Sequence, residues 1–505
     1  MANKLIRKIV FIEPKSPGAH VYRKWGLPRL GTIQLGTILE NAGYEVSVFI
    51  EDIKGIDWDM VFDADAVGIS TITSTAPRAY EMARQIRKLG IPVFMGGPHV
   101  SFLVEEALEN CDFVFRGETE EVIIPFIKAL ASDGKFEDIP GLCWHYGNRI
   151  QKNEFPAACP DLDKYPFPNF KLICGNKKFK GDISITPIMT SRGCPFGCNF
   201  CSVTRMFGRK YRFRSVENVM AELRTRKPRW TFFYDDNFAA NKEHTKKLLR
   251  QMLAERINTK WMAQVRIDVA RDEELLDLMV KTKCKYVYIG LESINPKTLE
   301  SLNKDQTPED IEHAIRVIQS RGIRVHGMFI FGADSDDTKT IRQTVKFAKE
   351  NGLSSVQFMI LTPLPGTPVF EQLEKEGRLI SRDWGYYDAH HVVFQPKQMS
   401  YLQLQKSTIS ATLRFYSFPR IINMIDRLDM KSVLVSIYGW RLSRQVRKNT
   451  RDFVKNLGEK YKVFGTDFDA AKHNVSIKAR KTSEDLKDFF HSINIENIKK
   501  WRESR

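Results

Sequence analysis

Residues 5–125 alternate short apolar segments with longer segments whose apolar positions recur at helical spacing. The short segments predict buried strands, and the longer ones predict helices that end at glycines. The expected strands are 9–12, 46–50, 66–69, 93–95 and 113–115, and the expected helices are 30–42 and 78–88. Strand–helix alternation with short connections is typical of a parallel sheet, so we expect a doubly wound, Rossmann-like α/β domain over residues 1–140.

The same alternation restarts after a gap and continues to about residue 365. The expected strands are 188–190, 230–234, 261–265, 286–289, 325–330 and 356–361, with helices between them. Six strand–helix units predict a partial or full TIM-like barrel, which we place at residues 185–395. In such barrels the reactive groups lie at the carboxyl ends of the strands.

Two regions do not follow this alternation. Residues 141–184 are rich in proline and lysine with weak periodicity, which predicts a linker. Residues 396–505 form a basic region whose pattern is helical at first, with aromatic side chains among the basic ones, and becomes polar and poorly patterned after residue 462. The fold class expected is therefore α/β, with a helical C-terminal region.

Composition limits the class of protein. A chain of 505 residues with 42% hydrophobic residues is expected to form two or three packed domains. No apolar run reaches the roughly 18–20 residues that span a bilayer, and the N-terminal apolar segment is too short for a signal peptide, so a cytoplasmic location is expected. The net charge of +17 favours an anionic partner, namely nucleic acid, a membrane surface or an acidic substrate. Ordinary lysine-rich solubility is the alternative.

Three of the eight cysteines, Cys194, Cys198 and Cys201, form a C-x3-C-x2-C motif directly after an expected strand. Cysteine thiolates are the usual ligands of iron–sulfur clusters. Three thiolates on a four-iron cubane leave one iron open to a small chelating molecule. A structural zinc site is the alternative, but it normally has four protein ligands, and no fourth ligand is evident nearby.

The motif, with Phe200 before its last cysteine, resembles the radical S-adenosylmethionine (radical SAM) superfamily. The resemblance implies a [4Fe-4S] cluster whose open iron binds the amino and carboxylate groups of S-adenosylmethionine. One electron, from an external donor such as flavodoxin or ferredoxin, then gives methionine and a 5′-deoxyadenosyl radical that abstracts hydrogen. The protein supplies orientation and a dry cavity.

The resemblance also implies cosubstrate contacts at the ends of later strands. Asp235 and Asp236 correspond to the position where the family binds the methionyl amino group, and Glu292 and Ser293 to positions near the ribose and carboxylate. Arg266 is expected to pair with the methionyl carboxylate. Two alternatives stay open: the Asp-Asp-Asn segment as a helix cap, and Arg266 in an ordinary surface ion pair.

The N-terminal domain resembles the cobalamin-binding radical SAM family, which includes anaerobic magnesium-protoporphyrin cyclase. The matching stretches are 28–31, 68–75, 96–99 and 116–118, and the resemblance covers residues 5–395. Small residues at strand ends let a large ligand approach the backbone, and hydroxyl groups can bind its phosphate or amide groups. The residues expected to contact cobalamin are Ser70, Thr71, Ser74, Gly96, Gly97, His99 and Glu118.

One family signature is missing. The D-x-H-x-x-G motif, whose histidine ligates cobalt, does not occur, and no histidine lies between Tyr44 and Pro98. We therefore expect cobalamin to bind without that ligand, and a sheet that binds no corrin is the alternative. His99 is expected to contact the tail of the cofactor or to pack in the core.

These features favour a cobalamin-dependent methyltransferase that acts on an unactivated carbon of a small lipophilic molecule, an isoprenoid lipid or a tetrapyrrole. The alternative is a non-methylating cyclase. RNA modification of the methylthiotransferase type, and with it a nucleic-acid partner, is disfavoured because the first 125 residues hold only Cys111. An electron carrier is disfavoured by the open iron. The basic C-terminal helices predict peripheral contact with the inner membrane face, the alternative being a solvated helical cap.

Overall fold

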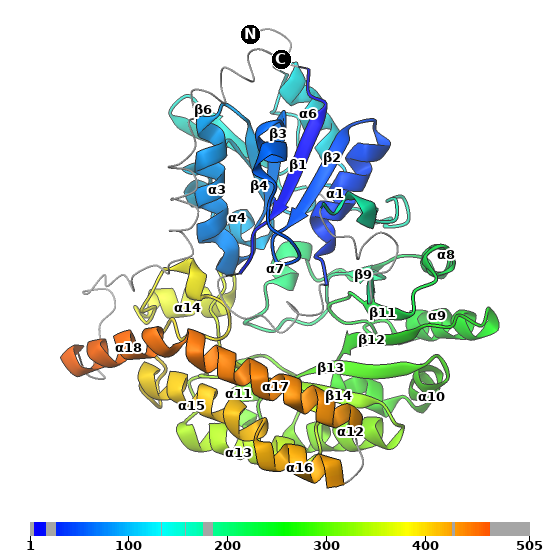
Figure 1. Ribbon diagram of the computed structural model, residues 1–505, viewed down its shortest axis with the longest axis vertical. Coiled ribbons are helices and arrows are strands. Elements are labelled where there is room, and N and C mark those ends of the chain that lie inside the picture. The colour runs from blue at the N-terminus through cyan, green and yellow to red at the C-terminus, as the bar shows by residue number, and fades with distance from the viewer. Residues whose placement is uncertain are drawn as a thin grey trace. The chain divides into compact units, whose positions relative to one another are not determined.

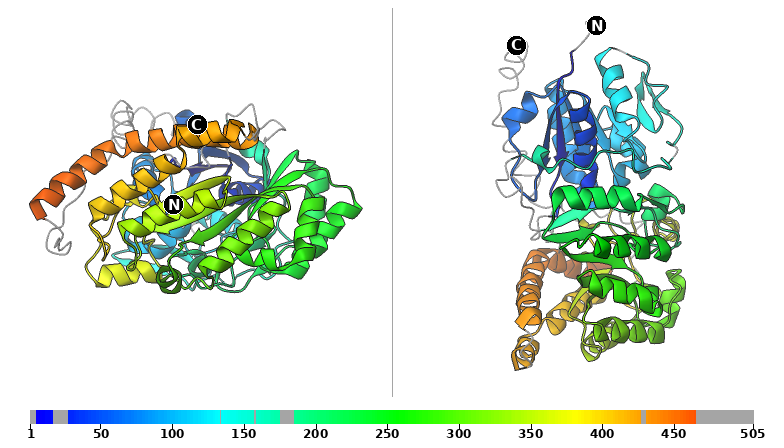
Figure 2. Two further views of the ribbon diagram at one scale, coloured as in Figure 1. Left: turned by 90° about the horizontal axis from the view of Figure 1, so that it is seen from below. Right: turned by 90° about the vertical axis from the view of Figure 1, so that its right-hand side faces the viewer.

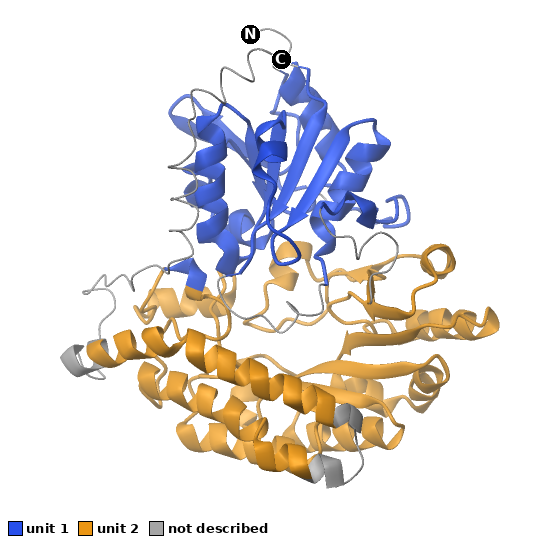
Figure 3. Ribbon diagram, viewed as in Figure 1, with its two compact units in different colours: residues 1–184, 383–385, 478–505 blue, residues 185–382, 386–477 orange. Residues whose placement is uncertain are grey.

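A computed structural model describes residues 5–16, 27–132, 134–156, 158–174, 185–426 and 430–464. The chain divides into two compact units (Figure 3). Unit 1 contains the described residues up to Cys174 together with Asp383–Gly385. Unit 2 contains Ile185–Arg382 and the described residues from Tyr386 onward. The end of the basic tail, residues 465–505, lies outside the described residues.

Unit 1 is built on one sheet with strand order β2-β1-β3-β4-β5-β6-β7 and helices on both faces (Figures 1 and 2). Its strands are β1 Lys8–Glu13, β2 Glu45–Ile50, β3 Ala66–Ser70, β4 Val93–Gly96, β5 Phe113–Phe115, β6 Leu142–Tyr146 and β7 Arg149–Lys152. Its helices are α1 Leu30–Asn41, α2 Trp58–Phe62, α3 Ala76–Lys88, α4 Pro98–Phe102, α5 Val104–Leu108 and α6 Ile123–Ala131. Strands β1 to β5 are parallel, which confirms the predicted doubly wound fold.

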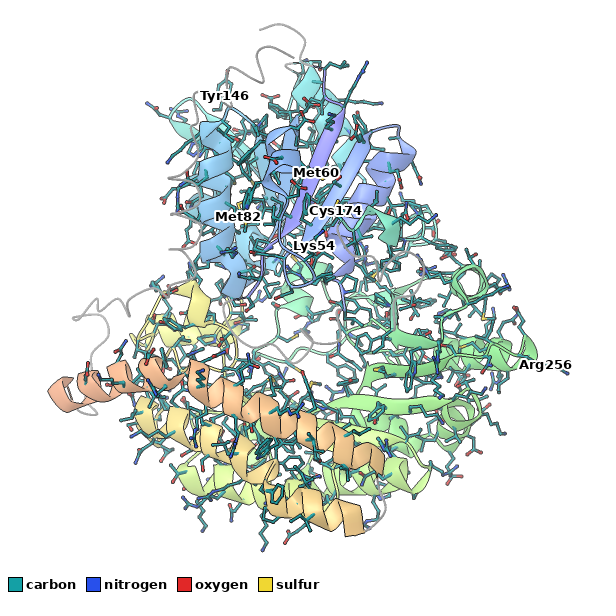
Figure 4. The ribbon with its side chains drawn as sticks, in the orientation of Figure 1. Lys54, Met60, Met82, Tyr146, Cys174 and Arg256 are labelled. Carbon is teal, nitrogen blue, oxygen red and sulfur yellow. The ribbon has the colours of Figure 1, made fainter. Side chains whose placement is uncertain are left out.

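The core of unit 1 explains why its strands are almost continuously apolar. Both faces of a doubly wound sheet are covered by helices, so side chains on either side of a strand are buried. Met82, which Figure 4 labels on α3, is completely buried. Phe126 of α6 contacts Phe94 and Phe115 edge to face, with ring centroids 5.2 and 4.9 Å apart. Such aromatic packing fixes α6 on the sheet.

The predicted linker 141–184 is wrong for part of its length. Strands β6 and β7 form an antiparallel hairpin that extends the sheet beyond β5. Further along, Ile173 pairs with Val48 of β2 at the opposite edge of the sheet. The periodicity of this segment is weak because β7 is an edge strand whose side chains are mostly exposed, so they carry little apolar signal.

Unit 2 contains a parallel sheet with strand order β15-β14-β13-β12-β11-β8, as predicted for a partial barrel. The strands are β8 Thr186–Ile188, β11 Trp230–Phe233, β12 Lys260–Val265, β13 Cys284–Glu292, β14 Arg324–Phe331 and β15 Ser355–Ile360. A short ladder joins β9 Ser191–Arg192 to β10 Arg212–Phe213. The helices are α7 Val203–Phe207, α8 Val216–Arg226, α9 Lys242–Ala254, α10 Glu273–Lys281, α11 Pro296–Ser301, α12 Pro308–Ser320, α13 Thr338–Glu350 and α14 Pro368–Lys375.

The basic region begins with a run of helices (Figure 1), the first and third of which contact β15. They are α15 Tyr401–Phe415, α16 Phe418–Asp426, α17 Met430–Asn449 and α18 Arg451–Phe464. Ser400 and Gln403 form a capping box at the start of α15, which satisfies two free backbone N–H groups. After α15, the hydroxyl of Tyr416 donates to the Val356 carbonyl at 2.8 Å and accepts from the Val356 N–H at 2.9 Å. Among the described residues, no helix is both long and apolar enough to cross a bilayer.

Candidate functional site

The three cysteines lie on the loop 193–201, the cluster loop, which follows β8 and β9 at the carboxyl edge of the unit 2 sheet. Asn199 anchors this loop, since its N–H donates to the Leu302 carbonyl at 3.1 Å and its side-chain amide donates to the Ser301 carbonyl at 2.9 Å. Gly193 has φ +83°, and a Cβ there would lie 3.0 Å from the Lys210 carbonyl oxygen. Glycine is therefore required at this turn.

The chemistry of the donor set fits an iron–sulfur cluster. Cys194, Cys198 and Cys201 are half-buried free thiols. Burial raises the pKa of Cys194, and burial together with the charges of Asp236 and the other two cysteines raises the pKa of Cys201 to about 12. The loop alone thus disfavours the thiolate forms of Cys194 and Cys201, and bound iron cations would supply the compensating charge. No group of three side chains that could hold a single ion occurs among the described residues. A cubane binds each thiolate through a different iron, so it needs no such convergence.

Asp235 holds the segment before the cluster loop in place. It is 1% exposed, and its carboxylate accepts hydrogen bonds of 2.7 Å from the Thr190 N–H, the Thr190 hydroxyl and the Ser191 N–H. These bonds explain why β8 ends at Ile188 and not at Thr190 as predicted. Asp235 is thus a positioning residue, since its oxygens already have partners within the protein.

The next two residues are better placed to bind a ligand. Asp236 is exposed to solvent, but protein atoms lie around its carboxyl group. This partial burial, and then the charge of Asp235, raise the pKa of Asp236 to about 7. Asn237 is 3% exposed, and neither its side-chain oxygen nor its nitrogen has a hydrogen-bond partner among the described residues. Buried amides are normally satisfied, so a bound molecule is the expected partner. The helix-cap alternative is wrong for α9, whose N-cap is Asn241.

Arg266 lies against the cluster loop. Its guanidinium group stacks 3.7 Å from the ring centroid of Phe196 and donates to the Asp305 carbonyl at 3.4 Å. The structure shows no ion pair between Arg266 and any carboxylate of the described residues, which argues against the surface ion-pair alternative. The cation–π contact keeps the guanidinium group beside the cysteines, with other N–H donors available.

Glu292 and Ser293 have protein partners. Glu292 is buried with φ +57°, and its carboxylate accepts a hydrogen bond of 2.8 Å from Lys304 Nζ. A Cβ at Gly290 would lie 2.3 Å from the Glu292 carboxylate, so only glycine leaves room for this pair. Ser293 is 2% exposed and its hydroxyl accepts from the Asn295 N–H at 3.0 Å. The structure therefore gives both residues a local structural role at the end of β13.

In unit 1 several predicted cobalamin contacts lie where β3 and β4 end. Thr71 is completely buried, and both its N–H and its hydroxyl donate to the Gly96 carbonyl, at 2.9 and 3.1 Å. Gly97 has φ +103°, and a Cβ there would lie 2.3 Å from the Thr71 carbonyl oxygen. Thr71 and Gly97 thus build the turn between β4 and α4.

Gly96 and Ser70 have different surroundings. They are register partners at the carboxyl ends of β4 and β3, and both are half-buried. A Cβ at Gly96 would meet no heavy atom within 4 Å. No hydrogen bond of the Ser70 hydroxyl is found within the described part of the chain. Open space beside a glycine, next to a hydroxyl group at the end of a parallel strand, fits the approach of a large polar ligand.

The remaining predicted contacts of unit 1 differ in exposure. The Ser74 hydroxyl is buried and accepts from Ser16 at 3.3 Å. His99 is 1% exposed, with its ring 5.2 Å from that of Trp384 and its Nε2 3.4 Å from Glu106 Oε1. Of the two roles expected for His99, this burial supports packing in the core. Glu118 is half-buried after β5.

One surface that sequence reasoning missed lies on the unit 2 sheet. Gly290, Met328 and Gln357 are register partners on β13, β14 and β15, and Met359 follows on the same face of β15. All four are half-buried, whereas Phe329 and Phe358, which point to the opposite face, are buried. We call these four residues the methionine face. The alternation of buried and half-buried positions along these strands could have indicated the methionine face, but only once the strand register is known.

Comparison with known proteins agrees with these observations. Residues 188–348 match the radical SAM superfamily, and residues 27–124 match the B12 binding domain. An uncharacterised methyltransferase of Pyrococcus horikoshii is 30% identical over 434 residues, which cover 83% of this chain and 94% of that protein. The bacteriochlorophyllide d C-12(1)-methyltransferase of Chlorobaculum tepidum is 27% identical, over 83% of this chain and 90% of that protein. The anaerobic magnesium-protoporphyrin IX monomethyl ester cyclase of Cereibacter sphaeroides is 26% identical, over 81% and 70%.

Solved structures show the same fold. The radical S-adenosylmethionine methyltransferase TsrM of Kitasatospora setae superposes with a TM-score of 0.63 at 20% identity, over 74% of this chain and 78% of TsrM. The cobalamin-dependent enzyme OxsB superposes with a TM-score of 0.65 at 16% identity, over 98% of this chain and 76% of OxsB. The chain therefore belongs to the cobalamin-binding radical SAM enzymes, a family whose cofactors are a [4Fe-4S] cluster, S-adenosylmethionine and cobalamin.

Proposed function

We propose that this enzyme transfers a methyl group to an unactivated carbon of a tetrapyrrole. The observation that carries the radical chemistry is the anchored cluster loop with its three free thiols. The bound cofactors together supply a 5′-deoxyadenosyl radical and a transferable methyl group. The protein's own residues bind these cofactors, orient the substrate and keep water from the radical.

Each cofactor has its own set of residues in this proposal. Cys194, Cys198 and Cys201 hold the cluster. Asp236 and Asn237 bind the methionyl amino group, because they follow a strand end with an accessible carboxyl group and an unpartnered buried amide. Arg266 binds the methionyl carboxylate with the N–H groups left free by its stacking on Phe196. In unit 1, Ser70 and Gly96 contact cobalamin.

The methionine face supports a bulky apolar substrate. Methionine side chains are flexible and polarisable, and they adapt to large apolar surfaces. Gln357 adds one polar group that can orient a ligand, as in most small-molecule sites. The names of the Chlorobaculum and Cereibacter relatives refer to magnesium tetrapyrroles, which favours this class over a polycyclic isoprenoid lipid.

The test is anaerobic reconstitution with iron, sulfide and hydroxocobalamin, followed by incubation with S-adenosylmethionine, a reductant and a panel of tetrapyrroles and polycyclic isoprenoids. We expect 5′-deoxyadenosine and S-adenosylhomocysteine to form together, and a product heavier by one methyl group. Cys194→Ala should abolish both nucleosides. The cyclase alternative predicts 5′-deoxyadenosine without S-adenosylhomocysteine, and that result would reject methylation. If the methylated product is an isoprenoid, the proposed substrate class is a polycyclic isoprenoid and not a tetrapyrrole.

We also propose that the C-terminal helices contact an anionic membrane surface, where a lipophilic substrate is available. Helix α17 exposes basic side chains near its end, at Arg441, Arg444 and Lys448. Phe418 of α16 and Leu434 of α17 are large apolar side chains that are 62% and 68% exposed. Exposed apolar groups combined with basic groups on helices are typical of interfacial binding.

A further inference from the structure

The segment Asp388–His391 is held at the carboxyl end of β15, the last strand of the partial barrel. The Ile360 N–H donates to the Ala389 carbonyl at 2.8 Å, which places this segment beside the end of the strand. Ala389 has φ +63°, an unfavourable conformation for a residue other than glycine. Such strain is kept where surrounding contacts impose it, and it is common at functional sites.

Side chains on both sides fix the backbone of this segment. The Asp388 carboxylate accepts from the His390 N–H at 2.9 Å and from the His391 N–H at 3.1 Å. The Gln405 amide donates to the His390 carbonyl at 2.8 Å and accepts from the Val392 N–H at 2.9 Å. The position of the His390 backbone is therefore set by side chains before it and from α15.

The two histidines of this segment have different surroundings. His391 is 1% exposed, its Nδ1 lies 2.9 Å from the Asp388 carboxylate, and its ring packs against Tyr386 and Phe453. His390 is half-buried, and its ring makes no hydrogen bond or ion pair with any residue that the structure describes. His391 is a structural residue, whereas the ring nitrogens of His390 have no polar partner in the described part of the chain.

The protonation of His390 suits a metal ligand. Burial lowers the pKa of His390, although the charge of Asp388 opposes this shift and the charge of His391 adds to it. This shift favours the neutral imidazole, which keeps a lone pair on one ring nitrogen. Neutral imidazole is the most common protein ligand of metal ions.

The location of His390 relates it to the proposed substrate surface. Met359 of the methionine face precedes Ile360, the residue whose N–H binds Ala389. His390 belongs to a loop beside the carboxyl end of β15, and this end of the strands is where such barrels carry reactive and binding groups. A flat macrocycle with a central metal presents both an apolar surface and an open coordination position, so it fits methionines and an imidazole together.

We propose that His390 is an axial ligand of the metal ion in a metallo-tetrapyrrole substrate, and that the methionine face contacts the macrocycle. The inference rests on the tetrapyrrole class given under the proposed function. The bond forms between a ring nitrogen lone pair of His390 and the open axial position of the metal, and no electron or proton is transferred.

Zinc protoporphyrin IX is the probe, because its zinc accepts one axial ligand and its absorption bands shift when the ligand binds. Reconstituted full-length enzyme is titrated with the probe, so that the cluster cysteines are occupied and do not bind zinc. We expect a shift of the main absorption band with wild-type enzyme and loss of this shift with His390→Ala. His313→Ala removes an exposed histidine of α12 and should leave the shift unchanged. Added imidazole should restore the shift to His390→Ala.

Free-base protoporphyrin IX, which has no metal, separates the proposed tetrapyrrole substrate class from the proposed His390–metal bond. If it binds wild-type enzyme and His390→Ala equally, the macrocycle is recognised without the metal, and the loss of the zinc shift then reports the His390 bond. An unchanged shift in His390→Ala, or binding of the zinc probe without a shift in wild-type enzyme, would reject His390 as the ligand and leave the tetrapyrrole class intact. If neither porphyrin binds, the tetrapyrrole class and the His390 ligand are both wrong, while radical cleavage of S-adenosylmethionine is still tested by 5′-deoxyadenosine.

Discussion

Asp235 and Asp236 are neighbours in the chain, but their surroundings give them different tasks. Asp235 accepts three hydrogen bonds from Thr190 and Ser191, whereas Asp236 is exposed. Asp235→Ala removes both acceptor oxygens and leaves the buried N–H groups of Thr190 and Ser191 without their partner. We expect this change to lower the free energy of unfolding of unit 2 by about 1–3 kcal/mol, measured by denaturant unfolding of the apoprotein.

Asp236→Asn is the matched change for ligand binding. It removes a carboxylate that burial and the charge of Asp235 disfavour in the folded protein, so the free energy of unfolding should not fall. Binding of S-adenosylmethionine to reconstituted enzyme should weaken, because the carboxylate that binds the amino group is lost. Equilibrium dialysis with labelled S-adenosylmethionine measures this effect. Unchanged binding by Asp236→Asn would show that the amino group is bound elsewhere.

His326 of β14 makes the stability of unit 2 depend on pH. The side chain is buried, its Nδ1 lies 2.7 Å from the Ser355 hydroxyl, and burial lowers its pKa to about 4. Between pH 6.5 and 4 the unfolded chain binds a proton that the folded chain does not. The free energy of unfolding should therefore be highest above pH 6.5 and fall with pH through this window, by up to about 3 kcal/mol.

The variant His326→Gln tests this origin. Glutamine can keep a hydrogen bond to Ser355 but cannot take up a proton in this range. Denaturant unfolding of the apoprotein at several pH values should show a smaller decrease between pH 6.5 and 4 than in the wild type. An equal decrease in the variant would assign the pH dependence to other groups.

Sequence reasoning at the residue scale found the positions better than the roles. The motif located Cys194, Cys198 and Cys201, because the spacing of thiolates is visible in the chain itself. It also found the paired carboxylates, but not that Asp235 would bind Thr190, a contact between residues 45 positions apart. His390 and Gln357 carry no local signal, since their availability depends on strand register and on neighbours far along the chain.

At the scale of elements, the turn between β4 and α4 contains two glycines with different reasons to be glycine. Gly97→Ala would put a methyl group 2.3 Å from the Thr71 carbonyl oxygen at φ +103°. We expect a loss of about 1–3 kcal/mol in the stability of unit 1. Gly96→Ala meets no atom within 4 Å and should leave the free energy of unfolding nearly unchanged. Thermal unfolding of the apoprotein compares the two.

For cobalamin binding, in contrast to stability, we expect the substitution of Gly96 to have an effect. A methyl group at this position would fill space that we assign to the cofactor, so Gly96→Ala should weaken hydroxocobalamin binding without unfolding unit 1. The visible absorption of bound cobalamin after gel filtration measures this. Full retention of cobalamin by Gly96→Ala would place the cofactor away from the end of β4.

The same scale shows which elements a sequence pattern can reveal. Strands β1, β3 and β4 and helices α1 and α3 were predicted because their buried sides make a strong apolar signal. Hairpin β6–β7 was missed because one of its strands is exposed and the hairpin joins the sheet through backbone hydrogen bonds, which do not depend on side-chain type. The end of β8 was misplaced for a related reason, since a distant carboxylate decides where that strand stops.

At the scale of the whole molecule, exposed positive charges on α17 support the proposed contact with an anionic membrane. Arg441, Arg444 and Lys448 are exposed on α17, and each cation near an anionic surface contributes about 1 kcal/mol. The exposed apolar side chains of Phe418 and Leu434 add burial in the interface. Part of the affinity should therefore be lost at high salt, which screens charges, and part should remain.

The triple variant Arg441→Glu, Arg444→Glu and Lys448→Glu should lower binding to vesicles of anionic phospholipid by more than about tenfold, because three attractive charges become repulsive. The matched control Lys281→Glu, Lys285→Glu and Lys297→Glu changes net charge equally at exposed positions outside the C-terminal helices, and it should bind nearly as well as wild type. Co-sedimentation at low and high salt measures both. Equal losses of vesicle binding in the two variants would mean that net charge alone attracts the protein. If the wild type does not bind at low salt, the membrane proposal is wrong, and α15 to α18 form a solvated cap on the barrel.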